Sequence, residues 1–374
     1  MENTPLDVAK TNWKQVLIFI GITFGLTYLL DLALYLTVGY GGQLGTGLLL
    51  QVQMLIPATV AMALQLFLFK NSSIYHLRER PRWFFYAYLA YALFYAALAV
   101  SVVFISNTAY QTVISVIAQF LNIGVLLLVV LLRLLAGKEA FARAGLGGGK
   151  VWQYLLFGLL FVAIYGLMTA LNALFGMGHT VDVKEFIKQA AGGQATGLDQ
   201  LPSWALLLLT GFQTVILGPI LGLLIAFGEE YGWRGYLQSE LIKIGKVRGI
   251  LLLGVIWGLW HTPIILMGHN YPGYPVLGSL LMVLYCIALA FLLGFAVLKS
   301  RSVWLAAFLH GLNNQVYSFL ILMVYTPNDP ILSFGAGIYG LLVLALIVGV
   351  LLVLARKEWA TPVGASSQQG IVSG

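Results

Sequence analysis

The chain has 374 residues, of which 60% are hydrophobic and only 9% are charged. A soluble globular domain carries about 25% charged residues, so this chain cannot cover a water-exposed surface and must be an integral membrane protein. The net charge of +7 does not indicate a nucleic-acid partner, because the basic residues fall in short loops between apolar runs. The single cysteine, Cys286, excludes an intrachain disulfide, and we interpret it as a small buried apolar residue.

Ten apolar runs are long enough for membrane-spanning helices, which need about 20 residues each. They cover residues 14–39, 44–69, 83–107, 110–136, 151–176, 203–240, 249–269, 276–299, 302–325 and 331–355. The first run exceeds the core of a signal peptide, which is roughly 7–15 residues, so we expect it to be retained as a span. The sixth is too long for a straight span and is expected to tilt or to continue past the bilayer. We therefore predict an all-α fold, a polytopic transmembrane helix bundle of about ten spanning helices.

Lysine and arginine alternate from loop to loop along the chain. They occur after the second, fourth, sixth, eighth and tenth runs, whereas residues 40–43, 108–109, 270–275 and 326–330 contain none. The exception is the loop 177–202, where Lys184 and Lys188 are offset by three acidic residues. By the positive-inside rule, this alternation places both termini in the cytosol.

The sixth run carries two adjacent carboxylates and an arginine, Glu229, Glu230 and Arg234. Ionised groups at membrane depth are costly, so they indicate a functional site unless they serve only to neutralise each other. Glu230 and Arg234 are four residues apart and share a helix face, which favours an ion pair. Glu229 lies about 100° around the helix. It is therefore expected to face a polar cavity as a separate carboxylate, suited to a general base.

Two histidines lie in later apolar runs. His261 follows Trp257 by four residues, so the indole covers the same helix face, and Pro263 is expected to kink the helix there. His310 and Asn314 share a face in the ninth run, and their side chains suit stabilisation of an oxyanion. Purely structural interhelical hydrogen bonds are the alternative interpretation for both.

Counted from the basic ends of their helices, Glu229, His261 and His310 all lie about 12–18 Å along the axis. Three helices thus place polar side chains in one layer, which random scatter over ten helices would seldom produce. We predict that the three side chains meet in a shared hydrated pocket beneath the inner leaflet. Asp31, in the first run, is interpreted as an interhelical hydrogen-bond partner or as part of a polar cavity wall.

Three motifs on separate helices resemble those of the CPBP family of intramembrane proteases, also called the ABI or CAAX-protease family, which includes the type II CAAX prenyl endopeptidases. The family pattern is Glu-Glu-xxx-Arg, then an aromatic-xxx-His, then His-xxx-Asn or Asp. The chain shows Glu229-Glu230-xxx-Arg234, Trp257-xxx-His261 and His310-xxx-Asn314 in that order. Tryptophan stands where phenylalanine is commoner. The resemblance covers residues 203–325, and the first five helices match no part of the family pattern.

The resemblance implies an intramembrane endopeptidase that hydrolyses a membrane-embedded or lipidated peptide near the cytosolic face. Glu229 would activate the water, His261 would help to hold it, and His310 with Asn314 would stabilise the oxyanion. Glu230, Arg234 and Trp257 would support the site. Two mechanisms stay open: zinc held by Glu229, His261 and His310 is one, and a metal-free glutamate mechanism is the other.

The same interpretation divides the chain into four parts. Residues 1–202 hold N-terminal transmembrane helices of unassigned role and the outer loop 177–202, in which residues 183–190 are expected to form an interfacial amphipathic helix or a substrate cap. Residues 203–325 form a CPBP-like catalytic bundle, 326–360 the final span, and 361–374 a disordered tail. The expected partners are the lipid bilayer and a membrane-associated peptide or protein, with no nucleic acid. The expected location is the plasma membrane of a bacterium.

Two other functions fit an intramembrane polar cluster. A proton-coupled transporter also uses Glu, His and Arg at membrane depth, although the sequence shows no internal repeat of the kind that many transporters contain. A catalytically silent membrane scaffold could have kept the fold and lost the chemistry. Loss of cleavage in a folded Glu229 variant separates the peptidase from both.

Overall fold

The computed structural model describes residues 10–37, 39, 44–105, 107–190, 197–329, 331–332 and 335–362. Among them, seven helices are long and apolar enough to cross a membrane, and they coincide with seven of the ten predicted runs. The other three runs form the shorter helices α13 and α14 (Lys246–Trp260 and Thr262–Leu266), α16 (Val303–Phe319) and α17 (Ile338–Leu354). The all-α bundle is therefore confirmed, whereas the count of ten spans stays a prediction. The predicted tail falls almost wholly outside the described residues.

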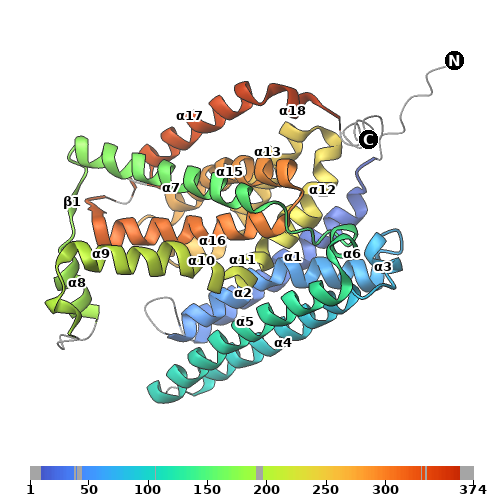
Figure 1. Cartoon of the computed structure of the whole chain (residues 1–374), viewed down its shortest axis with the longest axis horizontal. Helices are drawn as coiled ribbons and strands as arrows, with labels where there is room; N and C mark the ends of the chain where they lie inside the picture. Colours follow the sequence, from blue (N-terminus) through green and yellow to red (C-terminus); the bar gives the residue numbers. More distant parts are fainter. Residues whose placement is uncertain are drawn as a thin grey trace.

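The first part of the chain forms four long helices. Two short helices lie in the connections that carry lysine and arginine. In chain order, these helices are α1 (Trp13–Thr37), α2 (Leu44–Ala63) with a π-helical end, η1 (Leu64–Leu68), α3 (Ser73–His76), α4 (Arg82–Phe104), α5 (Thr108–Ala136) and α6 (Lys138–Arg143). In Figure 1, α4 and α5 lie along one flank of the bundle, and α17 lies along the opposite flank. Of the helices in this part, α2 is the most enclosed, with 56% of its spanning window buried against 28% for α1.

The middle of the chain contains α7 (Val151–Leu174), α8 (Val183–Ala190) and the long sixth run. That run is not one straight helix. Its segments are α9 (Ser203–Gly211), η3 (Phe212–Leu217), α10 (Gly218–Leu221), α11 (Leu223–Glu230), η4 (Tyr231–Leu237), α12 (Gln238–Leu241) and η5 (Ile242–Ile244). The helix breaks at Gly222, where ψ is 4°, so residues 203–221 form a candidate span, and α11 follows with residues 224–230 buried.

The remaining helices close the bundle. α15 (Pro275–Ser300) returns along α13, η6 (Leu320–Val324) extends α16, and α18 (Arg356–Ala360) follows α17. As Pro263 predicts, α13 and α14 are separate helices, with His261 between them.

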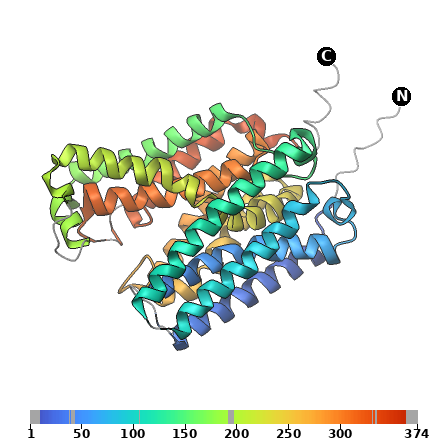
Figure 2. The same cartoon turned by 60° about the horizontal axis from the view of Figure 1, so that its bottom comes forward.

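A small antiparallel sheet lies at the end of the bundle that carries α8. β1 (Gly178–Thr180) pairs with β2 (Tyr325–Pro327), with His179 opposite Thr326, and η2 (Leu198–Gln200) precedes α9. The predicted helix over 183–190 is confirmed as α8, and its Val183 packs with Leu206 and Met323. Figures 1 and 2 show α8 and β1 at one end of the molecule and α3 at the other. Whether α8 lies at a membrane interface stays a prediction.

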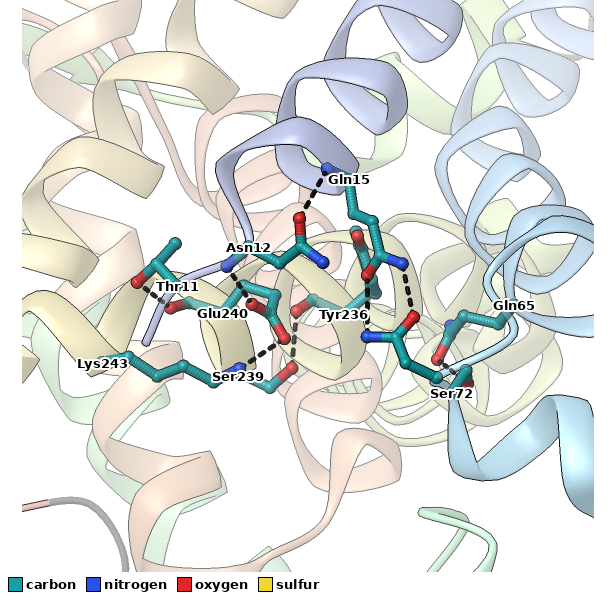
Figure 3. Close-up of polar contacts among 10 residues, drawn as sticks. Thr11, Asn12, Gln15, Gln65, Ser72, Tyr236, Ser239, Glu240 and Lys243 are labelled. Carbon is teal, nitrogen blue, oxygen red and sulfur yellow. Dashed lines mark hydrogen bonds and ion pairs between the residues drawn. The ribbon is translucent and has the colours of Figure 1, made fainter. Parts of the chain in front are cut away.

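The opposite end of the bundle, which carries the basic loops, is held together by a polar network (Figure 3). Asn12 N donates to Glu240 Oε2 at 3.1 Å, and Lys243 Nζ pairs with Glu240 Oε1 at 2.7 Å. The side chains of Gln15 and Asn71 also bond to each other, so the start of α1 is tied both to α12 and to the connection after α2.

Two glycines let α2 lie directly against the sixth run. A Cβ atom on Gly228 would lie 2.5 Å from Met54 O, and one on Gly232 would lie 2.4 Å from Pro57 Cβ. Both distances are far below van der Waals contact, so only glycine permits this approach at these positions. The close contact brings α2 beside the two carboxylates of α11.

Candidate active site

A cavity of about 370 Å³ lies within the bundle, and the predicted site residues Glu229, His261, His310 and Asn314 all line it. These residues come from α11, the α13–α14 break and α16, so the predicted meeting of three helices is what the structure shows. The volume falls within the range typical of ligand sites, about 300–1,000 Å³.

Glu229 is buried and is held by one strong contact. Trp257 Nε1 donates to Glu229 Oε2 at 2.7 Å. Within the described part of the chain, Oε1 has no hydrogen-bond partner, and the side chain lines the cavity. Glu229 is thus a carboxylate with one anchored oxygen and one available oxygen, as its place on the helix predicted.

Glu230 forms the centre of a buried ionic group. Its Oε1 accepts from Arg234 Nη1 at 3.0 Å and contacts His310 Nδ1 at 2.8 Å, and the side chains of Glu230 and Arg234 are fully buried. The Arg234 guanidinium also lies 4.0 Å above the Trp257 ring, which is cation–π geometry. The predicted ion pair is confirmed, and the sequence did not reveal that it would also orient His310.

The ring of His261 is oriented by its own helix. Nδ1 lies 2.9 Å from Trp257 O, and a carbonyl oxygen can only accept, so Nδ1 carries the proton. Nε2 is then left as an acceptor. Edge-to-face contact with Trp260, at 4.7 Å between ring centroids, fixes the imidazole plane.

Asn314 is positioned by its neighbour. Asn313 Nδ2 donates to Asn314 Oδ1 at 3.1 Å, which leaves the amide N–H groups of Asn314 as donors. Asn313 itself bonds to Tyr285 OH, from Nδ2 at 3.0 Å, and to Tyr165 OH. Asn313 lines the cavity and links it to two buried tyrosines.

The donors as placed do not form a zinc site. Over the described ranges, no three His, Cys, Asp or Glu side chains are grouped so that they could hold one metal ion. We therefore derive no step through a metal.

Several residues that line the cavity belong to no polar sequence motif, so the sequence did not indicate them. Gln53 of α2 lines the cavity and donates to Asp31 Oδ2 at 3.4 Å, so Asp31 is the interhelical partner that its burial requires. His269 also lines the cavity. Cys286 also lines the cavity and is buried, as predicted, with Sγ 3.8 Å from His261 Nδ1. Only a three-dimensional structure could place these residues together.

Comparison with known proteins supports the family resemblance over part of the chain. Residues 211–316 match the family model described as type II CAAX prenyl endopeptidase Rce1-like. A 56-residue segment is 39% identical to CAAX prenyl protease 2 of Methanococcus maripaludis, which covers 14% of this chain and 21% of that protein. The chain thus aligns with about a fifth of the curated relative's length. No solved structure matches.

Proposed function

We propose that this chain, which belongs to the CPBP or CAAX-protease family through residues 211–316, is an intramembrane endopeptidase that hydrolyses a peptide bond with a Glu229-activated water. The observation that carries the proposal is the convergence of Glu229, His261, His310 and Asn314 on one cavity. The family match supports a CAAX-type peptidase, and the catalytic roles below are our assignment.

The attacking water would bind between two acceptors. Glu229 offers Oε1, because Oε2 is engaged by Trp257, and His261 offers Nε2, because Nδ1 is engaged by a carbonyl. A water that donates both hydrogens directs a lone pair toward the substrate carbonyl. Glu229 then takes one proton as the water oxygen bonds to the carbonyl carbon. It returns that proton to the amine as the C–N bond breaks.

The oxyanion would be stabilised from α16. His310 Nδ1 is engaged by Glu230, so a protonated ring directs Nε2–H into the cavity. Glu229 and Glu230 carry two negative charges, and Arg234 with a protonated His310 carries two positive charges, so the buried group is then neutral overall. Asn314 supplies an amide N–H as the second donor. Donors fixed in a low-dielectric site typically contribute about 10²–10³ in rate each.

The lining of the cavity favours an internal peptide bond over a terminal one. Of the described residues that line it, none is a lysine or an arginine, and the protonated His310 is assigned to the oxyanion, so no lysine or arginine is at hand for a substrate's C-terminal carboxylate. Beside the polar residues, the walls include aromatic and aliphatic side chains, with Tyr285, Tyr317 and Met282 among them. They suit an extended segment of a membrane-associated peptide.

The test is Glu229→Gln in purified, reconstituted protein with a labelled membrane-peptide library as substrate. Glutamine keeps the acceptor for Trp257 and removes the base, so we expect cleavage to fall by at least about 10²-fold while the melting temperature stays unchanged. Metal analysis of the same preparations distinguishes a zinc-dependent mechanism from a metal-free one. A folded Glu229→Gln protein that cleaves at the wild-type rate would refute the assignment.

A further inference from the structure

A second cavity, of about 480 Å³, lies at the basic end of the bundle, the end that carries the basic loops. It shares none of its described lining residues with the catalytic cavity. Each of the five lysine- and arginine-bearing segments that follow the even-numbered runs contributes to its wall, with Ser73, Arg143, Lys246, Arg301 and Glu358. Figure 1 shows α3, α6 and α12, which adjoin three of these segments, at the same end of the molecule. The cavity thus forms where the basic segments meet, on the side that the positive-inside rule assigns to the cytosol.

The wall of the second cavity is basic, unlike that of the catalytic cavity. Of its described residues, four are cationic and one is acidic, namely Arg143, Arg234, Lys246, Arg301 and Glu358. The catalytic cavity has no lysine or arginine among its described residues. A hollow lined mainly by one sign of charge attracts ligands of the opposite sign. The second cavity therefore suits an anion.

Arg234 keeps hydrogen-bond donors that its ion pair does not use. Nη1 donates to Glu230 Oε1, whereas Nε and Nη2 are buried and have no hydrogen-bond partner within the described part of the chain. A guanidinium presents its donors in a rigid fork that matches the oxygens of a phosphate, and a buried donor without a partner is costly. Because Arg234 lines the second cavity, an anion bound there would supply the missing acceptor.

The turn between α15 and α16 adds a second guanidinium and a helix start to the same wall. Arg301 is exposed, and it takes part in no ion pair among the described residues. α16 begins at Val303, which also lines the cavity, and the first N–H groups of a helix have no acceptor within it. The partial positive charge of a helix start favours phosphate groups.

Gln238 contributes a hydrogen-bond acceptor one turn after Arg234. Its Nε2 donates to Gly294 O at 3.3 Å, which fixes the orientation of the amide, because a carbonyl oxygen can only accept. Oε1 is buried and has no partner among the described residues. A ligand with a hydroxyl group would donate to it. Apolar side chains, those of Val297 and Leu298, line another part of the wall.

We propose that the second cavity binds a phosphate ester that carries a free hydroxyl, with the phosphate at Arg234 and Arg301 and the hydroxyl at Gln238. Two sources offer this chemistry. One is the glycerol-phosphate head group of an anionic lipid in the cytosolic leaflet, and the other is a soluble glycerol or sugar phosphate. The proposal does not rest on peptidase function, because the site is separate from the catalytic cavity and binding is measured without catalysis.

The test is native mass spectrometry of the purified chain in a nonionic detergent. It is titrated with phosphatidylglycerol, with glycerol 3-phosphate, and with phosphatidylcholine, whose head group has no hydroxyl and no net charge. We expect saturable binding of phosphatidylglycerol or of glycerol 3-phosphate, and weaker binding of phosphatidylcholine. Phosphatidylglycerol that glycerol 3-phosphate does not displace identifies a lipid site. Binding of glycerol 3-phosphate alone identifies a site for a soluble ligand.

Arg301→Gln and Arg248→Gln form a matched pair of variants. Both arginines are exposed and belong to basic segments, but of the two only Arg301 lines the cavity. Arg301→Gln removes a charged hydrogen-bond donor and should raise the dissociation constant about tenfold. Arg248→Gln removes the same charge outside the cavity and should leave the dissociation constant unchanged.

Ser73→Glu tests the same wall by adding a charge. Ser73 is exposed at the start of α3, where a carboxylate favours the helix, so the variant should fold. Its negative charge should weaken binding of the phosphate ester. Wild-type affinity in both Arg301→Gln and Ser73→Glu would overturn the proposal. Equal weakening in Arg301→Gln and Arg248→Gln would also overturn it, as would the absence of binding by both phosphatidylglycerol and glycerol 3-phosphate.

Discussion

The helices around the cavity differ from those that flank it in how much of their surface the protein buries. In α15 and α2, 61% and 56% of the spanning window is buried, against 22% in α5 and α7 and 11% in residues 203–221. Most apolar side chains of the flanking helices face outward, as lipid contact requires. α2 lies far outside the family-matched residues 211–316, yet it is nearly as enclosed as α15.

The difference shows that the matched segment does not build its cavity alone. α2 contributes Leu50, Gln53 and Met54 to the wall and contacts α11 at Gly228 and η4 at Gly232. We infer that the site needs α2 as an integral part, whereas α4, α5 and α7 support it from outside. Substitutions of the same type in the two regions should therefore have unequal effects.

The largest effect is expected at the buried ion pair. Arg234→Met leaves Glu230 charged and enclosed, which costs about 3–5 kcal/mol of unfolding free energy in comparable buried pairs. The flanking control is Arg143→Met, which removes an exposed pair with Glu79 at 3.0 Å and should cost less than about 1 kcal/mol. Denaturant unfolding in detergent measures both. Equal costs for the two changes would contradict the distinction between core and flank.

The next effect is expected where α2 meets the sixth run. Gly232→Ala places a methyl group against Pro57, and overpacking of this kind costs about 1–3 kcal/mol. Gly124→Ala in α5 is the matched control, because a Cβ there meets no atom within 4 Å and alanine favours helix. Melting temperatures of the two variants should move in opposite directions. A Gly232→Ala protein as stable as the wild type would show that α2 can shift freely.

A smaller effect is expected at the polar contact between α1 and α2. Gln53→Leu removes the hydrogen bond to Asp31 and should cost about 1 kcal/mol, the usual net value of such a bond. Gln119→Leu, at an exposed position of α5, should cost nothing or stabilise the protein. The double variant Asp31→Leu/Gln53→Leu should recover most of the loss. If Gln53→Leu and Gln119→Leu were equally stable, Gln53 would behave like a residue of the flanking helices.

The smallest effect concerns α18 at the basic end. Hydrogen bonds from Lys299, at 2.9 Å, and from Lys246 hold the pKa of Glu358 below its usual value. A carboxyl with a lowered folded-state pKa contributes stability above its unfolded pKa and loses it as the pH falls through the folded value. Glu358→Gln should thus remove a small, acid-sensitive part of the stability, under about 1 kcal/mol because the pair is partly exposed. Unfolding midpoints of the wild type and of Glu358→Gln at neutral and mildly acidic pH measure this contribution. If stability depended on pH in the same way in both proteins, the prediction would be wrong.

Much of the catalytic layer could be predicted because its signal is local. Glu230 and Arg234 are one helical turn apart, as are Trp257 and His261, so spacing alone placed each pair on one face. The positions of Gln53 and Cys286 in the cavity could not be predicted in this way. They depend on which helices pack together. Neither the hydrophobic periodicity nor the hydropathy of the sequence determines that. The break at Gly222 was missed because the run reads as one continuous apolar helix.

The segment η4 follows Glu230 directly and is π-helical, with wider turns than an α-helix. Such a segment accommodates an additional residue between fixed neighbours on either side. If one residue were deleted from Tyr231–Leu237, the wide turn would tighten to an α-helical turn and the helix after it would keep its phase. The same deletion in the α-helical residues of α11 would rotate everything after it by about 100°. The sixth run should therefore tolerate the loss of one residue in η4 better than the loss of one residue in α11.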